Sequence, residues 1–244
     1  EKLVKLAKRM EETIDFDGLI ALGKSAPALS VEKETEEYFQ SLKNQGEKIK
    51  IGLAMDEAFC FFYEDNLKLL EEMGAELVPF SPIHDKKLPE DIQGLLLYGG
   101  YPVLYGKALE ENASMRKEIK EALSKGMPVL AECGGFMYLH DTFEDEKGIF
   151  RQGVGQIKGK VFNTGKLSRF GYIEASCKKP VFGTLIGTCP AHEFHYFDST
   201  NCGTDFHAKK PVGKRGWDCI HSTPTMIAGF PHFYYYGNPD LPKA

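Results

Sequence analysis

A cysteine that interrupts an apolar run carries the most visible chemistry in this sequence. Residues 127–132 read MPVLAE, Cys133 follows, and two glycines lead into residues 136–140. A buried strand that ends in Cys-Gly-Gly and continues as a helix predicts a nucleophile elbow. The first N–H groups of that helix favour the ionised thiol. A free cysteine is often only a small buried side chain, but this combination favours Cys133 as a nucleophile and the Gly134 N–H as an oxyanion donor.

Thiolate acyl transfer also needs a second oxyanion donor. Residues 95–98 form a second apolar run, which ends at Gly99 and Gly100. The exposed amides of such a glycine turn can face the Cys133 loop, so we predict Gly100 as the second donor. A glycine turn with no further role is the alternative interpretation.

The proton carrier must be one of seven histidines. Only His192, His195 and His232 lie in or beside late β-runs that can return to the strand of Cys133. Active sites of open α/β sheets gather at the carboxyl ends of the strands. We therefore predict His232 as the general acid and base, because it follows the run 226–230. His192 and His195 are three residues apart and point to opposite faces of a strand, so we expect no shared metal ion.

The elements that position these residues alternate between strand and helix. Apolar runs predict strands at 49–55, 76–80, 94–98 and 128–132, with helices at about 63–73 and 108–124. This order predicts an α/β fold with a mostly parallel sheet covered on both faces by helices. We expect the short β-runs after residue 140 to join the same sheet; they lie at 154–162, 171–176, 192–196, 219–222 and 226–230.

Composition excludes several classes of protein. The 244 residues correspond to one large domain or one domain plus a fragment, at about 150 residues per domain. A net charge of −5 with mixed signs gives no basic tract for nucleic acid. The apolar runs are shorter than the roughly 20 residues that span a bilayer. Six cysteines without a C-x-x-C spacing favour reduced thiols in a cytoplasmic protein and no metal site.

The amino-terminal part differs in texture from the rest. Residues 1–13 have apolar positions at helical spacing and predict a short amphipathic helix. Residues 14–46 look like a connector, and the main domain is expected from residue 47. The chain starts at a glutamate, so we expect it to be cut from something longer. Residues 18–25 fit the phosphate-loop pattern, but no buried strand precedes them and Pro27 follows, so we expect no nucleotide site there.

Five segments together resemble the glutamine amidotransferase domain of cobyrinic acid a,c-diamide synthases, over about residues 47–240. They are GGYP at 99–102, CGGFMYL at 133–139, SRFGY at 168–172, AHEFHY at 191–196 and the His232 segment. The resemblance implies the class I amidotransferase fold, a flavodoxin-like, mostly parallel sheet with helices on both faces. It also implies that residues 1–46 are the tail of an ATP-dependent synthetase domain plus a linker, and that 47–244 are the amidotransferase domain.

The chemistry that the resemblance implies is glutamine hydrolysis. Cys133 would attack the side-chain amide of glutamine, and His232 would protonate the departing ammonia and then activate water to cleave the thioester. In such enzymes ATP activates carboxylates of a corrin precursor, which the ammonia converts to amides. This chain would then need no cofactor, with ATP and Mg in the missing synthetase domain. The implied partners are glutamine, that domain and, through it, the corrinoid acceptor.

The resemblance also suggests substrate-binding residues. These are Gly99, Tyr101, His192 and Glu193, together with Arg169, whose guanidinium suits a carboxylate of glutamine or the corrinoid. Arg169 as an exposed structural side chain is the alternative.

Two positions depart from wider patterns. Tyr234 stands where many class I enzymes carry a glutamate that orients the histidine, so another group must orient His232. Val103 stands where the family's glycine loop usually has a glutamate.

Three other functions stay open at this point. The same glutaminase chemistry can serve another acceptor, such as a nickel-sirohydrochlorin, a related tetrapyrrole or a cell-wall precursor. The domain can be a catalytically inactive interaction module, with Val103 and Tyr234 as symptoms. It can also be a cysteine hydrolase of the same architecture that acts on peptides.

Overall fold

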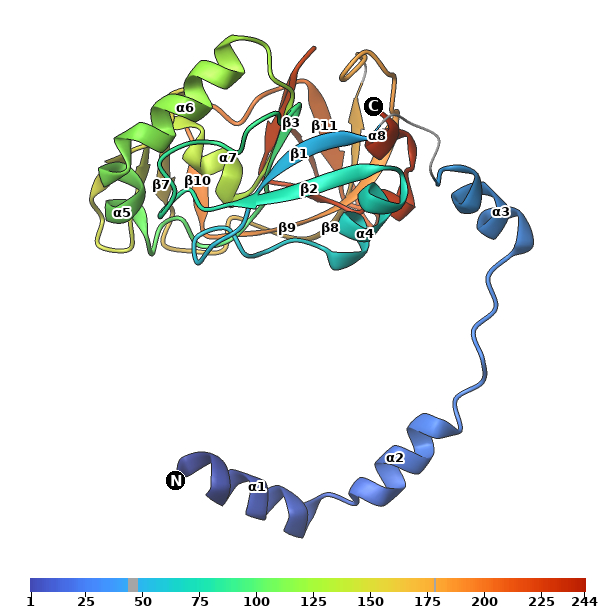
Figure 1. Ribbon diagram of the computed structural model, residues 1–244. Helices are drawn as coiled ribbons and strands as arrows, with labels where there is room; N and C mark the ends of the chain where they lie inside the picture. Colours follow the sequence, from blue (N-terminus) through green and yellow to red (C-terminus); the bar gives the residue numbers. More distant parts are fainter. Residues whose placement is uncertain (44–47, 178) are drawn as a thin grey trace. The chain divides into compact units, whose positions relative to one another are not determined.

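The computed structural model describes residues 1–43, 48–177 and 179–244, in two compact units, Glu1–Leu42 and Lys43–Ala244. The first unit contains α1 (Lys2–Thr13), α2 (Phe16–Lys24) and α3 (Lys33–Ser41), shown in blue in Figure 1. The predicted helix at 1–13 is confirmed, whereas the expected connector contains two further helices. The phosphate-loop pattern lies largely inside α2, which the Asp15 side chain caps by accepting the Gly18 N–H at 2.9 Å. The predicted boundary between residues 46 and 47 lies outside the described residues.

A six-stranded, mostly parallel sheet forms the centre of the second unit. Its strand order is β13-β14-β4-β3-β1-β2, and only β13 runs antiparallel to its neighbour. The five parallel strands follow the flavodoxin-like order 2-1-3-4-5. Their bounds are β1 Ile49–Ala54, β2 Ala75–Phe80, β3 Gly94–Leu97, β4 Val129–Glu132 and β14 Met226–Gly229, with β13 at His221–Thr223. All four residues of β3 and of β4 are buried, as expected for central parallel strands.

The helices of this unit are α4 (Glu64–Glu72), α5 (Gly106–Glu111), α6 (Ala113–Ser124), α7 (Gly134–Tyr138) and α8 (Asp240–Lys243). The predicted helix over 108–124 is two helices, separated at Asn112. The Asn112 side chain is buried and donates to the carbonyls of Pro82 and Asp85 at 2.8 and 2.7 Å, which ties the break to a neighbouring loop. In the described part of the chain, no helix is long and apolar enough to cross a membrane.

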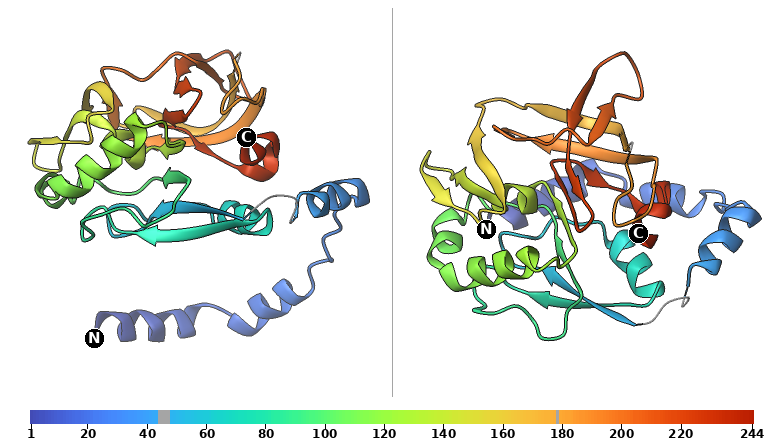
Figure 2. Two further views of the ribbon diagram at one scale, coloured as in Figure 1. Left: turned by 45° about the horizontal axis from the view of Figure 1, so that its top comes forward. Right: turned by 90° about the horizontal axis from the view of Figure 1, so that it is seen from above.

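Of the later strands, β13 and β14 join the first sheet, as expected for the run 226–230. The others form two further sheets, so the expectation that all of them join the first one is wrong. A four-stranded sheet contains β5 (His140–Glu144), β6 (Phe150–Gln152), β7 (Ile157–Asn163) and β10 (Phe197–Ser199). A five-stranded antiparallel sheet contains β8 (Arg169–Cys177), β9 (Thr188–His195), β11 (Phe206–Lys209), β12 (Gly216–Cys219) and β15 (His232–Phe233). Figure 2 shows the orange strands of these sheets outside the layer of β1 and β2.

The chain changes sheet at two short links. Ile220 has a φ of 64° and separates β12 from β13, so the predicted run 219–222 is split between two sheets. After β14 ends at Gly229, residues 230–231 carry the chain to β15, which pairs with β9. His232 therefore lies just beyond the carboxyl end of β14, as the first residue of a strand in the five-stranded sheet.

Candidate active site

Cys133 lies in a strained turn between β4 and α7. Its φ and ψ are 45° and −101°, a region that non-glycine residues rarely occupy and that often marks a functional site. The Cys133 N–H donates to the carbonyl of Gly229 at 2.8 Å, and the Gly135 N–H donates to that of Tyr98 at 3.0 Å. Because β4 lies between β3 and β14 in the parallel sheet, the turn places the sulfur at the carboxyl edge of that sheet.

The two glycines after Cys133 have no positive φ, so the sharp turn lies at Cys133 itself. Their small size instead allows neighbouring main-chain segments to approach closely. A Cβ at Gly135 would clash with the Leu97 carbonyl, and one at Gly134 would lie 3.1 Å from the Gly100 nitrogen. The structure thus brings together the two predicted oxyanion donors, Gly100 and Gly134. Among the described residues, neither N–H donates a loop, turn or cap hydrogen bond to a main-chain carbonyl. Main-chain N–H donors of this kind suit an oxyanion that forms beside the sulfur.

His232 is fixed against the same edge by close packing. It pairs with His192 in the antiparallel register of β15 and β9. The Phe61 ring contacts the imidazole edge-on, with 4.8 Å between centroids. A Cβ at Gly99 would clash with the imidazole, so this glycine makes room for the ring. Gly99 therefore shapes the site by being small.

Sequence reasoning missed the residue immediately before the nucleophile. The Glu132 side chain is buried, with Oε2 3.6 Å from Nδ1 of His232 and Oε1 accepting the Phe233 N–H at 3.1 Å. It occupies the role left open by Tyr234, because a carboxylate beside Nδ1 leaves Nε2 of the imidazole for proton exchange with the thiol. A charged residue in the apolar run MPVLAE was the available signal.

A buried asparagine holds the His232 segment from the other side. The Asn66 amide of α4 donates to the Phe233 carbonyl at 2.8 Å and accepts the Tyr235 N–H at 3.0 Å. Asn66 is almost inaccessible to solvent. Because both bonds engage main chain just after His232, this side chain positions β15 relative to α4.

Burial and neighbouring charges act in opposite directions on the pKa of His232. Burial lowers the pKa of His232, but the Cys133 thiolate and the Glu132 carboxylate outweigh it and raise that pKa to about 10. Burial raises the pKa of Glu132, while His232 and the Phe233 N–H oppose the rise. At neutral pH the histidine is therefore the imidazolium that a thiolate nucleophile requires as its partner.

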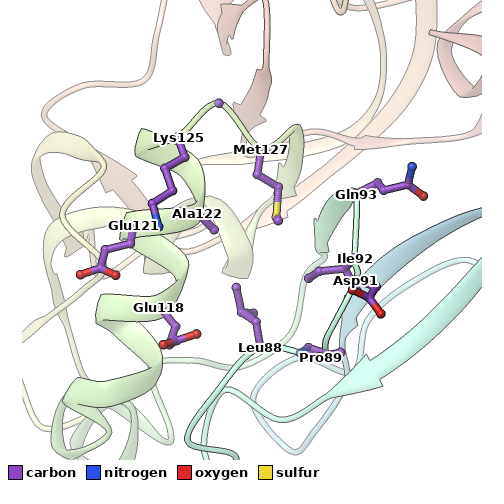
Figure 3. A pocket seen from close by; sticks show the side chains of 11 residues that line it. Leu88, Pro89, Asp91, Ile92, Gln93, Glu118, Glu121, Ala122, Lys125 and Met127 are labelled. Carbon is purple, nitrogen blue, oxygen red and sulfur yellow. The ribbon is translucent and has the colours of Figure 1, made fainter.

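A cavity of about 280 Å³ opens onto the nucleophile. It is lined by Phe61, Gly100, Tyr101, Cys133, His192, Phe194 and His232. The structure thus gathers both predicted catalytic residues, one oxyanion glycine, Tyr101 and His192 around one space. A larger cavity, about 550 Å³, lies between α6 and residues 88–93. Figure 3 shows its lining of acidic and apolar side chains together with Gln93 and Lys125. Among the described residues, no cysteine or histidine lines this cavity.

Arg169 and Glu193 do not line the cavity of Cys133. In the register of β8 and β9, Tyr172 pairs with His192, whereas Gly171 pairs with Glu193 and Arg169 with His195. Because side chains alternate along a strand, Glu193 and Arg169 lie on the face opposite His192. Glu193 is fully buried there. The structure therefore places neither side chain at this cavity, and their contact with substrate stays a prediction.

The described residues contain no group of three or more His, Cys, Asp or Glu side chains arranged to hold a metal ion. His192 lines the cavity, whereas Nδ1 of His195 donates to the Phe197 carbonyl at 2.6 Å on the other face.

A cysteine in a strained turn at the carboxyl edge of a flavodoxin-like sheet, beside a buried histidine and carboxylate, suits cysteine-dependent acyl transfer. Residues 50–235 match the CobB/CobQ-like glutamine amidotransferase domain, and the chain belongs to this family. It is therefore a glutamine-hydrolysing amidotransferase domain.

Curated relatives agree with this assignment, and a solved structure shares the fold. A cobyrinate a,c-diamide synthase of Caldanaerobacter subterraneus subsp. tengcongensis is 41% identical over 97% of this chain and 51% of its own length. One from Listeria innocua serovar 6a is 36% identical over 93% and 50%. The structure of PurLQS from Thermotoga maritima shares the fold, with a TM-score of 0.55, 16% identity and coverage of 80% of this chain and 95% of that one. The chain spans about half the length of the curated relatives it matches.

Proposed function

We propose that this chain is the glutaminase half of an ATP-dependent cobyrinic acid a,c-diamide synthase. The observation that supports this most is the arrangement of Cys133, His232 and Glu132 at one sheet edge, beside the main chain of Gly100 and Gly134. Such an arrangement suits hydrolysis of an amide through a thioester.

The reaction begins with attack by the Cys133 thiolate on the side-chain amide carbon of glutamine. The N–H groups of Gly100 and Gly134 stabilise the oxyanion, and His232 gives its proton to the departing ammonia. A glutamyl thioester on Cys133 remains. His232, now neutral, takes a proton from water, which attacks the thioester and releases glutamate and the thiolate. Glu132 orients the imidazole in both steps.

The cavity offers His192 and Tyr101 as polar groups for the amino acid end of glutamine. Burial and the positive charges of His232 and Lys210 lower the pKa of His192. The neutral imidazole can then act as donor and acceptor to substrate.

The ammonia serves an amidation that this chain does not perform alone. The relatives are about twice as long and are named for a diamide synthase. In our proposal the additional half binds ATP and Mg and activates carboxylates of the corrinoid acceptor, and the protein acts in the cytoplasm. Another tetrapyrrole or a cell-wall precursor as acceptor is the second candidate, since Cys133 and His232 serve any acceptor equally.

Glutamate release from glutamine tests the first half of the proposal. We expect the isolated chain to release glutamate, Cys133→Ala to abolish the release, and the control Cys60→Ala, at an exposed thiol, to retain it. An electrophilic glutamine analogue should label Cys133 faster than the other cysteines. Unchanged release by Cys133→Ala, or no preferential labelling, would leave an inactive interaction domain as the better description. Peptide cleavage without glutamine turnover would point to a peptide hydrolase.

A second experiment identifies the acceptor. The chain and the synthetase half are incubated with ATP, glutamine and either cobyrinate or nickel-sirohydrochlorin. We expect amide formation on cobyrinate only, and amidation of the other compound alone would overturn that assignment.

A further inference from the structure

An unusual run of aromatic rings covers the outward face of β8 and β9. It consists of Phe170, Tyr172, His192, Phe194 and Tyr196, here called the aromatic ladder. Successive ring centroids are 5.4 to 5.9 Å apart, in the order Tyr172, His192, Phe170, Phe194, Tyr196. The alternation of β8 and β9 produces the ladder, because it places these rings on the face opposite Arg169 and Glu193.

Most of the ladder faces solvent. Tyr172 is 76% exposed and Phe170 56%, and Phe194 and Tyr196 are each about half exposed. These side chains carry no formal charge apart from any proton on His192. Contiguous exposed apolar surface in a soluble domain marks an interaction site, and aromatic rings are enriched in the centres of interfaces.

The ladder is continuous with the active-site cavity. His192 and Phe194 line that cavity together with Phe61 and Tyr101, which are themselves 42% and 54% exposed. The exposed rings therefore extend from the wall of the nucleophile's pocket outward across the sheet. Ammonia formed at Cys133 leaves beside this surface. Ammonia that reaches bulk water near neutral pH is protonated and loses its nucleophilic lone pair.

We propose that the aromatic ladder is the docking surface for the ATP-dependent synthetase half, which covers it and the mouth of the cavity. This inference rests on the proposed function. The matched region is only about half of the length of the curated relatives, so a second half of similar length must find a contact surface on this chain. An aromatic rim around the cavity gives that partner an apolar contact that keeps water from the path of the ammonia.

Hydroxyl-radical footprinting read by mass spectrometry tests the docking without any variant. Labelling of the isolated chain is compared with labelling of the chain bound or joined to the synthetase half. We expect Phe170, Tyr172 and Tyr196 to be labelled in the isolated chain and protected several-fold in the larger protein. Phe150 and Leu185, which are exposed outside the ladder, serve as controls and should label equally in both.

Paired variants test what the contact does. The double variant Phe170→Thr/Tyr172→Thr removes exposed rings but keeps residues that favour strands, and Phe150→Thr is the matched control. We expect the double variant to retain glutamate release as an isolated chain. Its Kd for the synthetase half should rise about tenfold or more, as for loss of an aromatic contact in an interface.

In the combined protein, the double variant should release more glutamate per amide formed. Amide formation from added ammonium salt should be unchanged, because that route bypasses the contact.

Equal labelling of the ladder in the isolated and the combined protein would overturn the proposal. Protection that appears in the isolated chain as its concentration rises would overturn it in favour of a second copy of this chain. A Kd that stays unchanged in the double variant contradicts it as well. Loss of Cys133-dependent glutamate release is a separate result, and it would refute the proposed function instead.

Discussion

Replacing Glu132 by glutamine measures how much a buried carboxylate next to the nucleophile contributes to catalysis. Its Oε2 lies 3.6 Å from Nδ1 of His232, and both side chains are buried. At 3.6 Å, two unit charges interact by about 4.6 kcal/mol for an effective dielectric constant of about 20. Because 1.36 kcal/mol corresponds to one pKa unit, this charge accounts for at most about three units in the pKa of His232.

The sign of the effect follows from the charge that is removed. The pKa of His232 lies at about 10 because the Cys133 thiolate and Glu132 favour the imidazolium against burial. Glutamine keeps the shape of the side chain but loses the negative charge, so this pKa falls. The alkaline limb of kcat/KM reports the same proton and should move down by about one to three pH units. We also expect kcat/KM at neutral pH to fall by about 100-fold to 1,000-fold, since the imidazole loses its orienting partner.

Glutamate release is assayed from about pH 6 to about pH 11, a range that covers both limbs of the profile. Glu76→Gln, at an exposed position in β2 of the same sheet, is the matched control and should behave as the wild type. Urea unfolding separates an effect on catalysis from loss of fold. The reasoning is refuted if Glu132→Gln folds normally, keeps kcat/KM within about threefold and keeps its alkaline limb in place.

Three further substitutions test the supports of the site. Asn66→Ala removes both hydrogen bonds to the main chain after His232 and should lower the free energy of unfolding by about 2 to 4 kcal/mol. We expect kcat to fall as well, and a normal kcat would contradict a positioning role. Gly135→Ala should cost about 3 kcal/mol or more through its clash with a β3 carbonyl, whereas Gly23→Ala, with open space around it, should be tolerated in thermal unfolding. Burial lowers the pKa of His140, so the unfolded chain binds more protons than the folded chain below about pH 6.5. The free energy of unfolding should therefore fall as the pH drops below that value. His140→Gln should reduce this pH dependence, measured by urea unfolding at several pH values.

The parallel half of the fold was predictable because its strands are locally encoded. Strands β1 to β4 are short apolar runs, with helices between β1 and β2 and between β3 and β4. The two central strands, β3 and β4, are buried along their whole length, as such runs predict. The turn at Cys133 was predictable for the same reason, since strand, cysteine and glycines are consecutive. The role of Glu132 was not predictable from its neighbours, because its partner His232 arrives from 100 positions later in the chain.

Of the later runs, 226–230 joins the parallel sheet as predicted, whereas 154–162, 171–176 and 192–196 belong to other sheets. A run with one apolar face can pair with any available edge, and its sequence does not select the edge. The run 219–222 is divided between two sheets at Ile220, because the positive φ of this residue turns the chain from one sheet into the other. An isoleucine gives no local signal for that conformation, since glycine and asparagine are the residues that usually adopt it.

The pairing of His232 with His192 explains which predicted substrate residues reached the cavity. A strand alternates its side chains, so AHEFHY presents either His192 and Phe194 or Glu193 and His195 to the nucleophile. The antiparallel register of β15 selects the first set, because paired residues share a face and His232 must lie beside Cys133. A shift of one residue would exchange the two sets, burying an aromatic ring where Glu193 lies and placing a carboxylate beside the thiolate. One register therefore places the proposed catalytic base, the wall of the cavity and the exposed aromatic ladder together.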